Sequence, residues 1–151
     1  MKLKLITLSL FAFAVFGCNS TKTSSQNVED TAHNKIEETY WKLTKLEGKD
    51  VKMGAGQDVE PHFMLKTGEK TMFATSGCNT LNSEYKLEKG DRIRFTKLAT
   101  TLKLCPDMVL NEGDFFKVFE LADNYTIVGD TLSLNVGRRA PLAVFQAVYF
   151  E

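Results

Sequence analysis

Two cysteines bracket the stretch of sequence that most constrains how this chain folds. The stretch opens with Ser76-Gly77-Cys78-Asn79 and closes with Thr101-Leu102-Lys103-Leu104-Cys105. A third cysteine, Cys18, lies near the N-terminus. Any fold of this chain must therefore accommodate either a covalent link between the ends of this stretch or two free thiols there.

The first residues are expected to form a targeting segment and not part of the folded domain. Residues 1–17 have the pattern of a lipoprotein signal peptide: a basic start, an apolar run too short to span a bilayer comfortably, and a small residue before Cys18. Val15-Phe16-Gly17-Cys18 resembles a bacterial lipobox, in which the cysteine is acylated, for example by palmitate, and becomes the mature N-terminus. The alternatives are an ordinary cleaved signal peptide, or an uncleaved anchor, with a free Cys18.

Acylation of Cys18 would place the protein on a membrane. Asn19 is not the aspartate that marks inner-membrane retention in some bacteria. We therefore expect a lipid anchor in the bacterial outer membrane, with the domain in the periplasm or at the cell surface.

The remaining chain divides into a tether and one domain. Residues 18–38 are rich in serine, threonine and mixed charges, with almost no apolar residue before Ile36, so we expect a flexible tether that contains a solvated His33. Residues 39–151 are long enough for one hydrophobic core and not for two. We expect this domain to be monomeric.

The charge balance excludes one class of function. The chain has 19 basic and 19 acidic residues, and loss of Lys2 and Lys4 with the signal peptide leaves 17 against 19, a net charge near −2. Nucleic-acid binding requires a clearly basic face, so we expect no nucleic-acid partner.

Short runs of alternating polarity, divided by turn signals, predict a mostly β domain. The clearest turns are Lys89-Gly90-Asp91 and Gly129-Asp130. Residues 47–50 are expected to turn the chain, and residues 53–60 to form a loop. The expected strands are 40–46, 62–66, 71–75, 85–87, 92–95, 125–128, 131–135 and 142–150.

One helix interrupts these strands. Pro106 and Asp107 have the character of a helix start, and the phenylalanines that follow keep helical spacing. This spacing places Glu112 toward water together with Lys117 and Glu120. We expect the aromatic face to fill the concave side of an antiparallel, barrel-like α+β sheet. The predicted core residues are Trp41, Phe115, Phe119, Leu132, Leu134 and Phe145.

Cysteine counting predicts a Cys78–Cys105 disulfide. Acylation uses Cys18 and leaves two thiols in an oxidising compartment. Cys78 would follow a strand and Cys105 would directly precede the helix, so the bridge could join helix to sheet. The alternative is two buried, reduced cysteines that act as small apolar fillers.

Several residues, in order, carry a resemblance to a known family. They are Trp41-x-Leu43, Gly77-Cys78-Asn79, Tyr85, Thr101 four residues before Cys105, the phenylalanine-rich helix, and Leu132-x-Leu134 before an apolar last strand. This arrangement resembles the META domain family, which includes heat-inducible bacterial lipoproteins. Lys103 departs from the pattern, since methionine is frequent there. The resemblance implies a β-rich barrel with one helix, an envelope location and a link to heat, antibiotic or envelope stress, with no established catalytic residues.

The residues themselves indicate little chemistry. His62 is the only histidine in the domain, and we expect it at the surface or the edge of the core, so an enzyme with a histidine base is disfavoured. Cys105 and Met108 are soft ligands that suit copper, but a thiolate paired with Cys78 would not be free to bind it. We therefore expect no enzymatic activity, no cofactor and no metal.

Three functions remain open at this point. The first is a non-enzymatic envelope lipoprotein that binds a protein partner under stress, which an exposed apolar patch would favour. The second is a binder of a small apolar ligand or lipid, which a cavity beneath Phe115 and Phe119 would favour. The third is metal handling at Cys105 and Met108.

Overall fold

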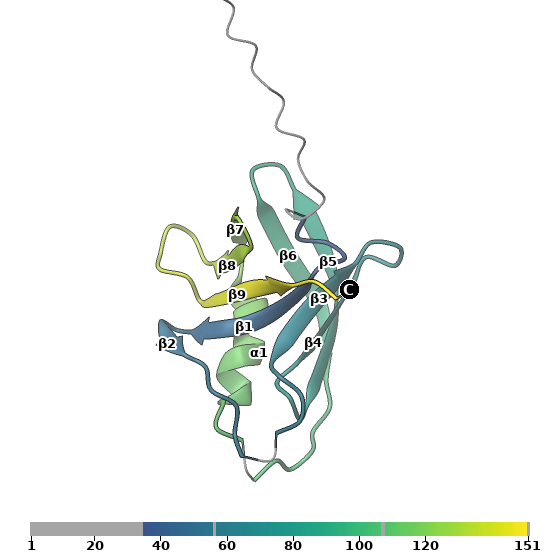
Figure 1. Cartoon of the computed structure of the whole chain (residues 1–151). Helices are drawn as coiled ribbons and strands as arrows, with labels where there is room; N and C mark the ends of the chain where they lie inside the picture. Colours follow the sequence, from purple (N-terminus) through teal and green to yellow (C-terminus); the bar gives the residue numbers. More distant parts are fainter. Residues whose placement is uncertain (1–34, 56, 107, 151) are drawn as a thin grey trace, which may run out of the picture.

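The computed structural model describes residues 35–55, 57–106 and 108–150 (Figure 1). The expected signal peptide, the expected acylation site Cys18, most of the expected tether with His33, and Asp107 lie outside these residues. The elements in chain order are β1 (Tyr40–Leu46), β2 (Lys49–Asp50), β3 (His62–Lys66), β4 (Thr71–Thr75), β5 (Thr80–Glu88), β6 (Arg92–Thr100), α1 (Glu112–Leu121), β7 (Asn124–Val128), β8 (Thr131–Asn135) and β9 (Ala143–Val148). No helix in this part of the chain is long and apolar enough to cross a membrane.

The strands form one antiparallel sheet that closes on itself. Each strand from β3 to β8 pairs with the next strand along the chain, and β1 pairs with both β3 and β9. The closing register runs from Tyr40 opposite Val148 to Leu46 opposite Ala143. The two-residue β2 only extends β1. The predicted barrel-like sheet with one helix is confirmed, as a closed barrel of eight strands.

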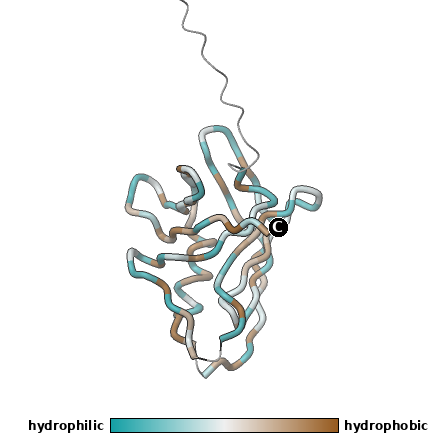
Figure 2. Tube along the Cα trace, viewed as in Figure 1, coloured by the Kyte–Doolittle hydropathy of each residue, from teal (hydrophilic) through white to brown (hydrophobic). Residues whose placement is uncertain are grey.

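Alternating side chains divide the barrel wall into an inner and an outer face. Successive residues of a strand point to opposite faces, and β5 accordingly buries Leu81, Ser83 and Tyr85 while the residues between them are exposed. Figure 2 shows the same alternation as changes between hydrophilic and hydrophobic colours along the strands. The hairpin of β5 and β6 is longer than expected, because β5 begins at Thr80 and β6 continues to Thr100.

The helix α1 supplies the aromatic core. Phe115 and Phe119 are fully buried and meet edge to face at 5.4 Å between ring centroids. Phe119 also contacts Phe63 and Phe95 from the barrel wall, at 5.5 and 5.3 Å. Trp41, Leu132, Leu134 and Phe145 are fully buried as well. The aromatic rings therefore pack against one another beneath the helix, at the place where a ligand cavity was considered.

The helix begins later than the sequence predicted. Asn111 is the N-cap, its side chain accepts a hydrogen bond from the backbone N–H of Asp114 at 3.3 Å, and Glu112 is the first helical residue. Asparagine is a strong N-cap, and acidic residues in the first turn complement the helix dipole. Cys105 consequently does not directly precede the helix, and Val109 is exposed in the intervening loop.

The folded domain begins before residue 39. Ile36 is buried, its carbonyl accepts a hydrogen bond from Trp41 Nε1 at 2.9 Å, and the backbone N–H of Glu38 donates to Leu65 at 2.8 Å. The carboxylate of Glu37 accepts a hydrogen bond from the Tyr85 hydroxyl at 2.5 Å. Residues 35–38, expected to belong to the tether, are therefore part of the domain, because these long-range contacts offset the polar composition of the segment.

Candidate functional site

The turn between β4 and β5 lies at one end of the barrel and contains Ser76, Gly77, Cys78 and Asn79. Gly77 adopts φ +100°, and a Cβ there would lie 2.1 Å from Nε2 of Gln57 and 2.3 Å from the carbonyl oxygen of Val59. Glycine is required at this position both for its backbone conformation and for space. This close approach lets the Gln57 side chain donate to the Ser76 carbonyl at 3.0 Å, which joins the loop before β3 to the turn.

Asn79 connects this turn to the chain that follows β6. Its side-chain Oδ1 accepts hydrogen bonds from the Lys103 backbone N–H at 2.7 Å and from the Thr101 hydroxyl at 2.9 Å. Its Nδ2 donates to the Lys103 carbonyl at 3.0 Å. Asn79 itself is buried. The buried amide thus holds the Thr101 side chain and the Lys103 backbone in place, and we call residues 101–105 the clamped segment.

Glu112 completes the same network from the start of α1. Its carboxylate accepts hydrogen bonds from Asn79 Nδ2 at 2.8 Å, from the Asn79 backbone N–H at 3.1 Å, and from the Ser76 hydroxyl. Burial raises the pKa of Glu112, but the hydrogen bonds from Ser76 and Asn79 outweigh burial, so the pKa lies below its usual value. The expectation that Glu112 points toward water was wrong, because the turn offers the carboxylate donors that compete with water.

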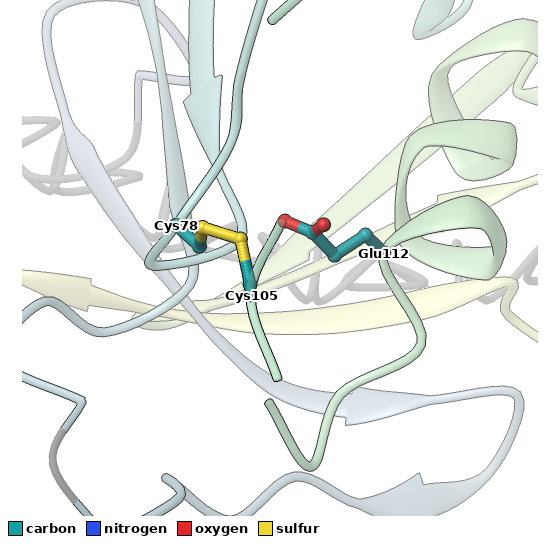
Figure 3. A group of neighbouring side chains, drawn as sticks. All are labelled: Cys78, Cys105 and Glu112. Carbon is teal, nitrogen blue, oxygen red and sulfur yellow. A yellow bond between two sulfur atoms is a disulfide. The ribbon is translucent and has the colours of Figure 1, made fainter. Parts of the chain in front are cut away.

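Cys78 and Cys105 are joined by a disulfide in the structure, with Cα atoms 6.4 Å apart (Figure 3). The bridge links the turn to the clamped segment. Figure 3 also shows the Glu112 carboxylate pointing toward the two sulfur atoms, and the three possible ligand atoms lie within 4.8 Å of one another. In the bridged form neither sulfur is a thiolate, so copper binding through Cys105 and Met108 has no free thiolate to use.

The clamped segment presents apolar side chains to solvent. Leu102 is 91% exposed and Leu104 is 99% exposed, while Val109 in the following loop is 67% exposed. The two leucines alternate with Thr101 and Lys103, whose backbone groups bond to β5 and to Asn79. A pocket of about 390 Å³ adjoins this surface, and its lining includes Val59, Cys78, Lys103, Cys105, Pro106 and Met108.

The other predicted site residues lie elsewhere in the barrel. Tyr85 lies further along β5, where its hydroxyl bonds to Glu37. Burial and the Glu37 carboxylate raise the pKa of Tyr85. Trp41 binds the backbone of Ile36. The structure thus brings Gly77, Cys78, Asn79, Thr101 and Cys105 together at one end of the barrel and does not bring Trp41 or Tyr85 to them.

None of the contacts described for His62 joins its ring to a serine or cysteine that could act as a nucleophile. Its ring stacks on Tyr40 at 4.1 Å between centroids, and Nδ1 lies 2.9 Å from the Glu60 carbonyl oxygen. Burial lowers the pKa of His62. The side chain is therefore held at the edge of the core by an aromatic neighbour and a backbone carbonyl.

Comparison with known families gives a clear assignment. The sequence profile of the META domain matches residues 34–149, which is most of the chain. The chain belongs to the META domain family. The matched range begins before residue 39, in agreement with the folded contacts of residues 35–38.

Two solved structures resemble this META domain in fold. One is the NMR structure of a protein from Burkholderia xenovorans, with TM-score 0.57 and 20% identity, which covers 75% of this chain and 83% of that one. The other is also an NMR structure, with TM-score 0.57 and 16% identity, covering 74% of this chain and 90% of that one. No curated protein matches the chain. At these identities the two structures support the fold alone.

Several of the residues that suggested the resemblance to META domains lie in one hydrogen-bonded, disulfide-linked cluster at this end of the barrel, among them Asn79, Thr101 and Cys105. The departure at Lys103 also has an explanation, since its backbone carries the contacts to Asn79 and its side chain is exposed. META domains are not known for an enzymatic activity. Glu112 was missed as a cluster member, since no local pattern links it to a turn 33 residues earlier.

Proposed function

We propose that this META domain is a non-enzymatic envelope lipoprotein that binds a protein partner through Leu102, Leu104 and Val109. We call these three residues the apolar tip. Acylation of Cys18 would hold the protein at the outer membrane, and partner binding would support the envelope under heat or antibiotic stress.

The exposure of Leu102 and Leu104 is the observation that carries this proposal. Single exposed apolar residues are ordinary, whereas two leucines exposed by 91% and 99% in one short segment are a recognisable interaction feature. The segment is also fixed, by the Asn79 amide and by the disulfide. A surface that is already ordered loses less conformational entropy when it binds a partner.

The position of the apolar tip suits a protein that is anchored at its N-terminus. Lys35 and Ile36 line a pocket together with Leu87 and Asp91, at the hairpin of β5 and β6. Figure 1 shows that the loop that follows β6 lies at the opposite end of the barrel from this hairpin. A tether attached at residue 35 would therefore leave the apolar tip directed away from the point of attachment. This arrangement favours a protein partner, and not the anchoring bilayer, as the surface that contacts the apolar tip.

Site-specific photocrosslinking tests the proposal. A photoreactive amino acid at position 104 should give a discrete crosslinked species in intact cells, and Leu102→Ser should reduce its yield. The matched control is position 128, because Val128 is also strongly exposed but lies at the end of β7. Equal crosslinking from positions 104 and 128, or none from position 104 under heat or antibiotic stress, would contradict the proposal.

Binding of a small apolar ligand is a second candidate function. The pocket that would hold the ligand is not the one expected beneath Phe115 and Phe119. Ile36, Leu87, Tyr125 and Ile127 line a pocket of about 510 Å³, which also includes Lys35, Glu37 and Asp91. Mouths of β-barrels are common ligand sites. Native mass spectrometry of the protein isolated from envelopes should then show a bound lipid that Ile127→Glu removes and Val128→Glu retains.

A further inference from the structure

Three metal-ligand side chains converge at the disulfide end of the barrel. Cys78 comes from the turn after β4, Cys105 from the clamped segment, and Glu112 from the start of α1 (Figure 3). One ligand atom from each lies within 4.8 Å of the others, and all three residues are partly buried. The chain is thus folded so that two sulfur atoms and a carboxylate oxygen share one small volume.

Asn79 supplies an outer shell to this group. Its Nδ2 donates to the Glu112 carboxylate at 2.8 Å and lies 3.5 Å from Cys105 Sγ. The amide is also held by the Thr101 hydroxyl and the backbone of Lys103, and these contacts do not involve the sulfur atoms. Hydrogen bonds that orient metal ligands are a regular part of protein metal sites. Breaking the sulfur–sulfur bond would therefore leave the bonds that position Asn79 and Glu112 in place.

The group is accessible from solvent. Both cysteines line the pocket of about 390 Å³ described above, together with Pro106 and Met108. A metal ion can therefore reach the sulfur atoms without unfolding of the barrel.

We infer that Cys78, Cys105 and Glu112 form a zinc site when the disulfide is reduced. Two thiolates and one carboxylate are ligand types that Zn²⁺ accepts in tetrahedral sites, with water in the fourth position. The oxidised protein excludes the ion because its sulfur atoms are bonded to each other. This inference does not depend on the apolar tip and concerns a different activity of the same end of the domain.

A dithiol is a sufficient reductant to open the Cys78–Cys105 disulfide. A dithiol transfers two electrons and two protons to the disulfide, becomes a disulfide itself, and leaves Cys78 and Cys105 as thiols. Zn²⁺ then displaces the two thiol protons and binds two thiolates. In the envelope the dithiol would come from a thiol–disulfide oxidoreductase, and in the test it is dithiothreitol.

Metal titration of both redox forms tests the site. The full chain carrying Cys18→Ser, purified in mild detergent, contains only the two relevant cysteines. After reduction and removal of dithiothreitol, it should bind one Zn²⁺ per chain in competition with a chromophoric chelator, whereas the oxidised chain should bind none. Co²⁺ in place of Zn²⁺ should give the absorption bands of a tetrahedral site with thiolate ligands.

One variant and its control test whether Glu112 is a zinc ligand. Glu112→Gln in the reduced chain should weaken zinc binding by at least about tenfold, the lower end of the effect seen for outer-shell partners. Glu120→Gln, an exposed glutamate on the same helix, should leave the affinity unchanged. Equal affinity of the reduced chain and its Glu112→Gln variant, or equal binding by the oxidised chain, would overturn the inference.

If reduction unfolds the chain, circular dichroism can follow whether Zn²⁺ restores the fold. Refolding on addition of Zn²⁺, abolished by Cys78→Ser, would support the site. A reduced chain that stays unfolded with equimolar and excess Zn²⁺ would overturn it.

Discussion

The side-chain amide of Asn79 binds both backbone groups of Lys103, much as a neighbouring β-strand would. Oδ1 accepts from the Lys103 N–H at 2.7 Å and Nδ2 donates to the Lys103 carbonyl at 3.0 Å. One buried side chain therefore continues the pairing of β5 and β6 beyond the backbone hydrogen bond from the Thr101 N–H to the Thr80 carbonyl. Leu102 and Leu104 lie on either side of Lys103, whose backbone is held in this way, and both leucines are exposed to solvent.

Asn79→Ala should destabilise the domain by about 2 to 4 kcal/mol, because it leaves several partly buried backbone and carboxylate groups without partners. Chemical denaturation measures the free energy of unfolding. Asn82→Ala, an exposed asparagine on β5, is the matched control and should cost far less. A loss below about 1 kcal/mol at position 79 would show that water replaces the amide.

The disulfide should be present in the protein isolated from cells. Mass spectrometry without reduction should show the peptides of Cys78 and Cys105 linked. For a sequence separation of 27 residues, the chain-entropy relation gives a stabilisation of about 3.5 kcal/mol as an upper value. Alkylatable thiols at both positions, in protein prepared with rapid acid quenching, would contradict this prediction.

Phe119→Ala should destabilise the domain by about 3 to 5 kcal/mol, because it removes a fully buried ring that contacts Phe63, Phe95 and Phe115. Phe116→Ala on the same helix is the comparison and should cost less, since Phe116 is only partly buried. Similar losses for the two variants in urea titrations would count against a core centred on Phe119.

Glu38 should make stability depend on acid pH. Hydrogen bonds from the hydroxyl and backbone N–H of Thr67 lower the pKa of Glu38 from 4.5 to about 2. A carboxylate with a lowered folded-state pKa stabilises the fold above its unfolded pKa, and this contribution is lost as pH falls from about 4.5 to about 2. Glu38→Gln should therefore flatten the profile of melting temperature against pH in that window.

Glu69 is exposed and lies in the same turn as Thr67, between β3 and β4, so it provides the control for this experiment. Glu69→Gln should retain the acid dependence of the parent protein. A profile for Glu38→Gln that overlays the parent between pH 2 and 5 would show that the segment before β1 is not held by Thr67.

Cys18→Ser should release the protein from the membrane into the soluble fraction, because acyl chains on this residue would supply the anchoring energy. Fractionation of cells that express the parent and the variant measures this, and mass spectrometry of the N-terminal peptide should show lipid on the parent only. Membrane retention of the variant, together with an unmodified parent peptide, would contradict lipid anchoring.

Local sequence was sufficient for the parts of the fold that local forces decide. The bounds expected for β1, β3, β4 and β8 match the structure, because polarity of period two and turn residues specify a half-buried strand within a few residues. The phenylalanine spacing identified the helix and its buried face. The cysteine count indicated the pair that the structure joins.

Tertiary structure decided the features that depend on contacts between distant residues. The helix begins at Glu112 and not near Pro106, and Glu112 turns to Ser76 and Asn79, because buried donors from a turn far away in sequence compete with water for its carboxylate. Residues 35–38 join the domain because Trp41, Leu65 and Tyr85 supply partners that no short window contains. Closure of β9 on β1 likewise follows from strand order around the barrel, since the residues that pair are separated by almost the whole domain.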